Sequence, residues 1–168
     1  MKNGIDPGIN YYADNWNYFD EPIGAIYQLM NNPDSSLYYL QRAIAIDPAN
    51  QMTRISFGET LLLKNQYDSA MAIFLKPVAH FRKENDEWDL MRILLDVSKT
   101  YQKKANEREA LQYAWEDFSI AQKANIKPYM VQDYLQLSKI YNDLHKDDSA
   151  YFFIQQYIAL KDSVSNQQ

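Results

Sequence analysis

Residues 57–74 read FGETLLLKNQYDSAMAIF. Small and apolar residues recur at spacings of three and four on both sides of the polar stretch around Gln66, and this spacing is typical of the buried face of an α-helix. Gly58 and Ala70 lie 12 positions apart. Small side chains on facing surfaces allow two antiparallel helices to pack closely. The stretch therefore predicts a hairpin of two helices.

The same pattern occurs four times, and the two small residues of each pair are always separated by the same interval. The pairs are Gly24 and Ser36, Gly58 and Ala70, Ser98 and Ala110, and Ser138 and Ala150. A larger residue follows the first member of each pair by three positions; these residues are Tyr27, Leu61, Tyr101 and Tyr141. The second members of successive pairs are spaced more widely after hairpin two than before it. The six extra positions are roughly 1.7 helical turns, so we expect longer second helices, or longer links, after the first hairpin.

The composition favours an all-α fold. The chain of 168 residues contains only 4 Gly and 6 Pro, and no stretch shows the alternation of a β-hairpin. We expect an N-terminal cap or flexible segment over residues 1–16 and one helical domain over residues 17–168, with hairpins at about 17–48, 51–84, 87–124 and 128–163. Asp34, Asp68 and Asp147 precede second helices and are candidate N-caps.

These hairpins resemble tetratricopeptide repeats (TPRs), whose pattern is W-x2-L-G-x2-Y, then A-x3-F, then P. The matching residues are Ile23-Gly24-x2-Tyr27 with Ser36-x3-Leu40 and Asp47-Pro48, Phe57-Gly58-x2-Leu61 with Ala70-x3-Phe74, and Leu137-Ser138-x2-Tyr141 with Ala150-x3-Ile154. Hairpin three departs at Ala114 and at Asp117, where the family has a large and a small residue. Pro77 replaces a small residue of hairpin two and is expected to kink or end that helix. The resemblance implies an α-solenoid, a right-handed superhelix of about four antiparallel hairpins.

The resemblance also implies a concave groove, lined by the first helices of the hairpins, that binds a protein or peptide. The corresponding residues are Gln28, Met52, Ile55, Glu59, Leu62, Arg92, Leu95, Lys99, Gln132, Leu135, Lys139 and Asn142. The Lys and Asn of family members that clamp a C-terminal carboxylate are replaced here; the clamp positions hold Ile55, Leu95 and Leu135, and Glu59, Lys99 and Lys139. An apolar strip with basic neighbours predicts a partner segment with apolar anchors and acidic character.

The alternative to partner binding is that the faces beside the apolar strip are ordinary solvated surface. The strip itself would then be covered by the aromatic residues of the N-terminal segment, such as Trp16, or by a neighbouring domain. Deleting residues 1–16 distinguishes these interpretations, because a self-occupied groove loses stability and gains affinity for peptides on deletion.

Other classes of function are disfavoured. The formal net charge is −5 without a concentrated basic face, which argues against nucleic acid. Cysteine is absent, and no catalytic motif, paired-carboxylate constellation or metal-binding spacing is evident. His80 and His145 are interpreted as surface or structural residues. We expect no enzyme activity, no cofactor, no metal and no direct membrane insertion of this segment.

The last hairpin also resembles the terminal repeat of TPR regions in bacterial two-component sensors and regulators. That resemblance implies a sensory input domain of a histidine kinase or transcriptional regulator, in an extracytoplasmic (periplasmic) location; otherwise a cytoplasmic location is expected. Three hypotheses stand: a peptide-binding adaptor, a signalling input domain, and a structural scaffold in a larger assembly. The sequence leaves the partner, the compartment and the oligomeric state open.

Overall fold

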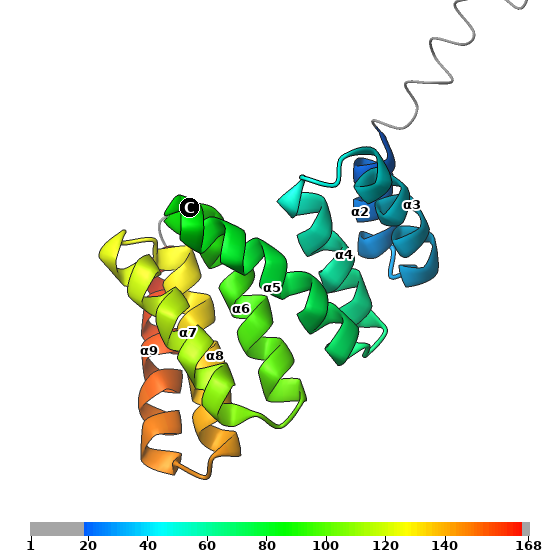
Figure 1. Ribbon diagram of the computed structural model, residues 1–168. Helices are drawn as coiled ribbons and strands as arrows, with labels where there is room; N and C mark the ends of the chain where they lie inside the picture. The colour runs from blue at the N-terminus through cyan, green and yellow to red at the C-terminus, as the bar shows by residue number, and fades with distance from the viewer. Residues whose placement is uncertain (1–18, 166–168) are drawn as a thin grey trace, which may run out of the picture. The chain divides into compact units, whose positions relative to one another are not determined.

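The computed structural model describes residues 19–165, which form eight α-helices and no strand (Figure 1). The helices are α2 (Asp20–Leu29), α3 (Pro33–Ile46), α4 (Gln51–Leu63), α5 (Tyr67–Glu84), α6 (Glu87–Lys103), α7 (Glu107–Lys123), α8 (Lys127–Asp143) and α9 (Asp147–Ser165). The all-α prediction is confirmed. The N-terminal segment 1–16, with its aromatic residues, lies outside the described residues.

The chain divides into two compact units, with the boundary between Ile73 and Phe74, inside α5. In the first unit α3 packs against α2 and α4. In the second unit α7 packs against α6 and α8, and α8 packs against α9. One cluster of buried side chains in the core of the second unit joins α7, α8 and α9: Ala110, Ala114, Phe118, Leu137, Ile140 and Phe153.

The paired small residues bring two helices close together. Ser98 Oγ donates a hydrogen bond to the carbonyl of Ala110 at 2.8 Å, and Ser138 Oγ donates to the carbonyl of Ala150 at 3.0 Å. All four residues are buried. The serine side chain is small enough for the facing helix to approach closely, and its buried hydroxyl still has a hydrogen-bond partner.

Six of the turns between the described helices share one backbone conformation and hydrogen-bond pattern. A residue with positive φ ends each preceding helix; these residues are Asn31, Asn65, Asn85, Ala105, Asn125 and His145. The next N–H donates back to a carbonyl five positions earlier, as from Asp86 to Phe81 at 2.9 Å. This is the Schellman arrangement, which satisfies carbonyls at the helix end. From Asn65 to His145 this pattern recurs at even intervals, and this regular helix-plus-turn length sets the period of the later hairpins.

Among these six residues, Ala105 is expected to lose the most conformational energy, because its Cβ is strained at a φ of 52°. Substituting Ala105→Gly is expected to raise the free energy of unfolding by about 1 kcal/mol, since glycine adopts this conformation freely. Urea unfolding followed by tryptophan fluorescence measures the change. Ala124→Gly is the matched control, since Ala124 ends α7 at a φ of −85° and gains nothing from glycine. Equal effects of the two substitutions would contradict the strain at Ala105.

Several details differ from the sequence predictions. Asn32, not Asp34, caps α3, and its side chain accepts a hydrogen bond from the N–H of Ser35. Asp68 and Asp147 lie inside the first turns of α5 and α9, because those helices begin at Tyr67 and at Asp147 itself. A carboxylate there still complements the positive end of the helix dipole.

The second helices lengthen as expected, from 14 residues in α3 to 18 in α5 and 17 in α7. Pro77 was expected to kink or end α5; it does not end the helix, which continues through it to Glu84, and the kink stays a prediction. Proline removes only one backbone donor from the helix, and a helix of this length retains its other hydrogen bonds.

Candidate functional site

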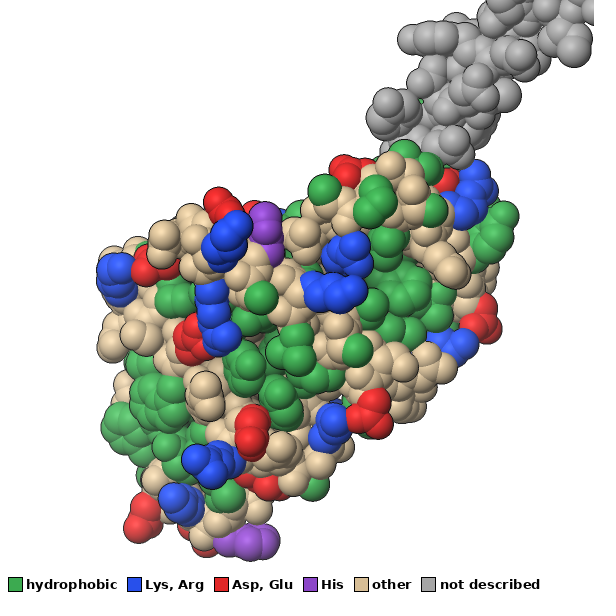
Figure 2. Space-filling model, in the orientation of Figure 1, with side chains coloured by type: hydrophobic (Ala, Val, Ile, Leu, Met, Phe, Trp, Pro, Cys, Tyr) green, Lys and Arg blue, Asp and Glu red, His purple; other side chains and the backbone are tan. Residues whose placement is uncertain are grey.

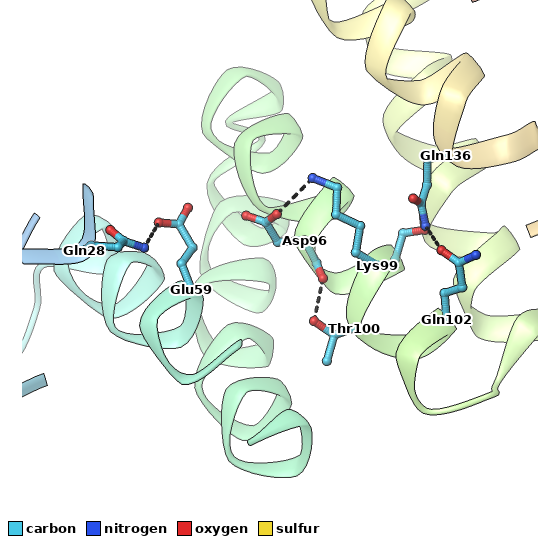
Figure 3. A network of polar contacts seen from close by, with 8 residues as sticks. Gln28, Glu59, Asp96, Lys99, Thr100, Gln102 and Gln136 are labelled. Atoms are coloured by element: carbon cyan, nitrogen blue, oxygen red, sulfur yellow. Dashed lines mark hydrogen bonds and ion pairs between the residues drawn. The ribbon is translucent and has the colours of Figure 1, made fainter. Parts of the chain in front are cut away.

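The first helices of the last two hairpins, α6 and α8, form a continuous hollowed face in the second unit. Gln136 of α8 joins them, because its Nε2 donates to Ser98 Oγ at 3.3 Å and to Gln102 Oε1 at 3.0 Å. Figure 3 shows Gln136 pointing at Gln102, with Lys99 on the same helix as Gln102. Gln136 is 3% exposed. A buried amide with both donor hydrogens used holds the two helices in register.

Two adjoining hollows of about 240 and 430 Å³ lie along this face and share Lys99. Together their lining defines the α6–α8 groove: Met91, Arg92, Leu95, Asp96, Lys99, Gln102, Lys103, Tyr129, Gln132, Gln136, Lys139 and Asp143.

The groove carries more positive than negative charge, although the chain as a whole has a net charge of −5. Its basic residues are Arg92, Lys99, Lys103 and Lys139, and its acidic residues are Asp96 and Asp143. Lys99 Nζ lies 3.4 Å from Asp96 Oδ1 and stays 45% exposed (Figure 3). Arg92 and Asp89 are 3.7 Å apart. Such solvent-accessible pairs contribute little to stability.

Figure 2 shows one face of the molecule, on which hydrophobic side chains lie among scattered basic and acidic ones. One hollow outside the groove, of about 350 Å³, includes Arg82 and Glu116. Arg82 Nε and Nη2 donate to the two oxygens of Glu116 at 3.0 and 2.5 Å, and this hydrogen bond raises the pKa of Arg82. A bidentate pair satisfies both partners internally.

Two carboxyl groups are buried beneath the groove. Asp117 of α7 and Asp133 of α8 are both 0% exposed, and their oxygens find no hydrogen-bond donor among the described residues. Burial and the neighbouring Asp133 raise the pKa of Asp117 to about 10, and burial raises that of Asp133 to about 7. Two ionised carboxylates can only accept hydrogen bonds, so a proton held by one of them allows it to donate to the other.

Charges on α6 act on this pair. Asp96 raises the pKa of Asp117, whereas Lys99 lowers the pKa of both aspartates. Burial, followed by the charge of Asp133, raises the pKa of Tyr134. Because neither aspartate reaches the surface, the pair cannot contact a substrate directly. We interpret it as a proton-sharing contact between α7 and α8.

Six of the seven groove residues predicted in the second unit lie along this hollowed surface. Five are in the α6–α8 groove, and Asn142 lines an adjacent hollow. Leu95 contributes little surface because it is 6% exposed, and Leu135 is half-buried.

In the first unit the candidates are less available to a partner. Ile55 is 4% exposed and belongs to the core. Gln28 Nε2 donates to Glu59 Oε2 at 3.1 Å (Figure 3), and Met52 and Leu62 are half-buried. The expectation that Ile55 offers a groove surface is therefore wrong; its side chain packs inward on α4.

Sequence reasoning missed Gln136 and the aspartate pair. The expectation that no paired carboxylates exist is corrected by Asp117 and Asp133. The available signal was Asp117 itself, a charged residue in a repeat position that requires a small one. His80 and His145 are both exposed, which agrees with their interpretation as surface residues.

Within residues 19–165, no group of three His, Asp or Glu side chains is arranged to hold a metal ion. None of the described helices is both long enough and apolar enough to span a bilayer.

Comparisons with known proteins support the fold. The sequence matches no protein-family model and no curated protein. Among solved structures, the apo form of RapI superposes on 89% of this chain with a TM-score of 0.81 and 15% identity. Aspartyl phosphate phosphatase F from Bacillus subtilis covers 89% with a TM-score of 0.80 and 19% identity. The chain spans 57% and 41% of the lengths of these two proteins.

A third similar structure is a kinesin light chain with nearly identical TPR-like repeats from Podosopora anserina. It covers 88% of this chain, which spans 76% of its length, with a TM-score of 0.71 and 14% identity. These likenesses show that the chain has a TPR-like helical repeat fold.

Proposed function

We propose that the protein binds a segment of another polypeptide along the α6–α8 groove. The observation that carries this proposal is a continuous hollowed face on which four basic side chains lie around the half-buried ring of Tyr129 and the buried Met91 and Leu95. Helical repeats generally present such faces to partner segments, because neighbouring helices together form a surface longer than either provides alone.

The chemistry of the groove favours a partner segment with acidic side chains and apolar anchors. Tyr129 offers half-buried ring surface at one end, next to the buried Met91 and Leu95, and Lys99 lies at the junction of the two hollows. Lys139 has no ion-pair or hydrogen-bond partner within residues 19–165. Complementary charge on the partner would speed its association and fix its orientation.

Reversing three groove charges tests this proposal. The variant Arg92→Glu, Lys99→Glu, Lys139→Glu is expected to weaken binding of short acidic, apolar peptides by roughly 100-fold, because three favourable charge contacts become repulsive. Fluorescence anisotropy with peptides of graded acidic content measures affinity. We expect affinity to fall with added salt, since exposed charges are screened.

The matched control reverses one Arg and two Lys elsewhere in the second unit. Lys83, Arg108 and Lys146 are all exposed and lie outside the groove. Their replacement by Glu changes net charge equally and should leave most of the affinity intact. Equal losses in the two triple variants would indicate general electrostatic attraction and would overturn the proposed groove.

The name of the Bacillus protein describes a phosphatase, but at 19% identity the likeness concerns the fold. In the present chain the two carboxyls with raised pKa values are fully buried. We therefore propose binding and not catalysis. The hypotheses of a signalling input domain and of a structural scaffold can be distinguished from an adaptor by the gene sequence that follows Gln168 and by pull-down experiments.

A further inference from the structure

The buried carboxyl pair lies beneath the part of the α6–α8 groove that Lys99 occupies. Lys99 lines both hollows, together with Gln132 in one and with Gln136 in the other. Asp133 lies between these two glutamines on α8, and its side chain is fully buried. Gln136 fixes this stretch of α8 against α6, because its Nε2 donates to Oγ of Ser98, the residue before Lys99. The surface cation and the buried carboxyl therefore lie at the same level of the two helices.

Two charged residues of the groove act on the pair, and both belong to α6. Burial raises the pKa of Asp117 and of Asp133, and Lys99 lowers the pKa of both. Asp96, which lines the groove beside Lys99, raises the pKa of Asp117 (Figure 3). On α8 itself, burial and then Asp133 raise the pKa of Tyr134. A change of charge in this part of the groove therefore changes the affinity of the pair for protons.

The other helices present rings or paired charges near the two aspartates. The ring of Tyr134 lies 5.0 Å from that of Phe118 on α7 and 6.2 Å from that of Phe153 on α9, measured between centroids. Glu116, which precedes the aspartate of α7, accepts a hydrogen bond from Arg82 of α5. The groove is thus the side from which an added charge reaches the pair.

An acidic segment in the groove would add such a charge. A carboxylate bound at Lys99 offsets the positive charge that favours ionised aspartates. Its own negative charge acts in the same direction as that of Asp96, which favours a proton on Asp117. Both effects have the same sign, and a single charge acts over a longer distance inside a protein than in water.

We propose that binding of an acidic segment in the α6–α8 groove is coupled to the uptake of a proton by Asp117 and Asp133. This inference rests on the proposed binding function and adds a means of regulating it. Neither aspartate touches the partner, because both are fully buried. Since linkage is reciprocal, a segment that raises the proton affinity of the pair binds more tightly when the pair is protonated.

The sign and the pH range follow from the charge of the pair. The pKa of Asp133 is about 7 and that of Asp117 about 10, so at pH 6 the free protein already holds most of both protons. Above pH 7 Asp133 is ionised in the free protein and regains part of a proton when the segment binds. Affinity is therefore expected to fall about threefold between pH 6 and pH 8.5.

Isothermal titration calorimetry on the full chain counts the protons taken up. The probe is an acidic, apolar peptide without histidine, acetylated and amidated at its ends, so that its own groups do not titrate in this range. Titrations in HEPES and in Tris, which differ in heat of ionisation, give the number of protons per bound peptide. We expect roughly 0.3 proton at pH 7.5 and almost none at pH 5.5.

Asp117→Asn is expected to bind the peptide with almost no proton uptake, because the amide donates to Asp133 and leaves it ionised. Asp148→Asn is the matched control at an exposed position and should keep the uptake. His80 and His145 are present in both variants, so a proton taken up by either histidine would appear in both.

The coupling is also measurable without a partner. Lys99→Gln removes the positive charge and is expected to raise the pH at which Asp117 and Asp133 titrate, followed by the NMR shifts of their carboxyl carbons. Lys103→Gln is the control, because Lys103 is an exposed groove residue one turn further along α6. It should leave that titration almost unchanged.

Peptide binding without proton uptake, or uptake that persists in Asp117→Asn, would overturn the coupling and leave the binding function standing. Equal titration shifts in Lys99→Gln and Lys103→Gln would also overturn it. If no acidic peptide bound the wild-type chain, the proposed function would be wrong, and the coupling with it.

Discussion

Replacing Asp117 by Asn is expected to raise the stability of the second unit at pH 8 and to flatten its dependence on pH. In the wild type, two buried carboxyls between α7 and α8 share one environment and hold protons to higher pH than usual. The asparagine amide carries no charge and donates to Asp133 without a shared proton. We expect a gain of about 2 kcal/mol at pH 8.

The direction follows from proton linkage. In the unfolded chain both carboxyls ionise near their ordinary pKa of 3.8, whereas in the folded protein the pKa of Asp133 is raised to about 7 and that of Asp117 to about 10. Between pH 4 and pH 7 the folded state therefore binds more protons than the unfolded state. Its stability falls as pH rises, by about 1.4 kcal/mol per pH unit for each proton. Asp133 ceases to contribute to this slope above about pH 7, and Asp117 above about pH 10.

Urea unfolding followed by the fluorescence of Trp88 and Trp115 measures this effect at pH 5, 7 and 8.5. Asp148→Asn is the matched control, because it makes the same chemical change at an exposed position. The Asp117→Asn variant should differ little from wild type at pH 5 and increasingly as pH rises. A wild-type protein with the same pH slope as Asp117→Asn would show that the pair holds no shared proton.

Gly24→Val is expected to destabilise the first unit by about 3 kcal/mol. A Cβ at position 24 would lie 2.6 Å from Leu40 Cγ and 2.8 Å from Leu40 Cδ2, closer than carbon atoms pack. Leu40 is fully buried, so it cannot move into solvent to relieve the contact. Hydrogen–deuterium exchange of the α2 and α3 amides measures the loss of protection.

A double-mutant cycle assigns this effect to the contact itself. Leu40→Ala alone should cost about 3 kcal/mol through the cavity that it leaves. The double variant Gly24→Val, Leu40→Ala should lose less stability than the sum of the losses in the two single variants, because the valine fills part of the cavity. Ala25→Val is the control on the neighbouring, half-buried position. Strict additivity would contradict the predicted clash.

Tertiary structure decided where the chemistry of the molecule lies. Asp117 and Asp133 belong to different helices and different hairpins, so no local sequence pattern predicts that their side chains lie close together. Gln136 resembles an ordinary helix residue in the sequence, and only the packing of α8 against α6 makes it a buried link. Ile55 matched a groove position by spacing, yet it is buried in the core.

The hairpin array itself was determined by the sequence, because its cause is local and periodic. A small residue must recur wherever two helices touch, so pairs such as Ser98 with Ala110 mark each hairpin before any contact is known. The caps, the buried Gln136 and the buried carboxyl pair required the tertiary structure. Each depends on which side chain a neighbouring helix covers, and burial by a neighbour changes a residue's charge, partners and exposure without changing its place in the repeat.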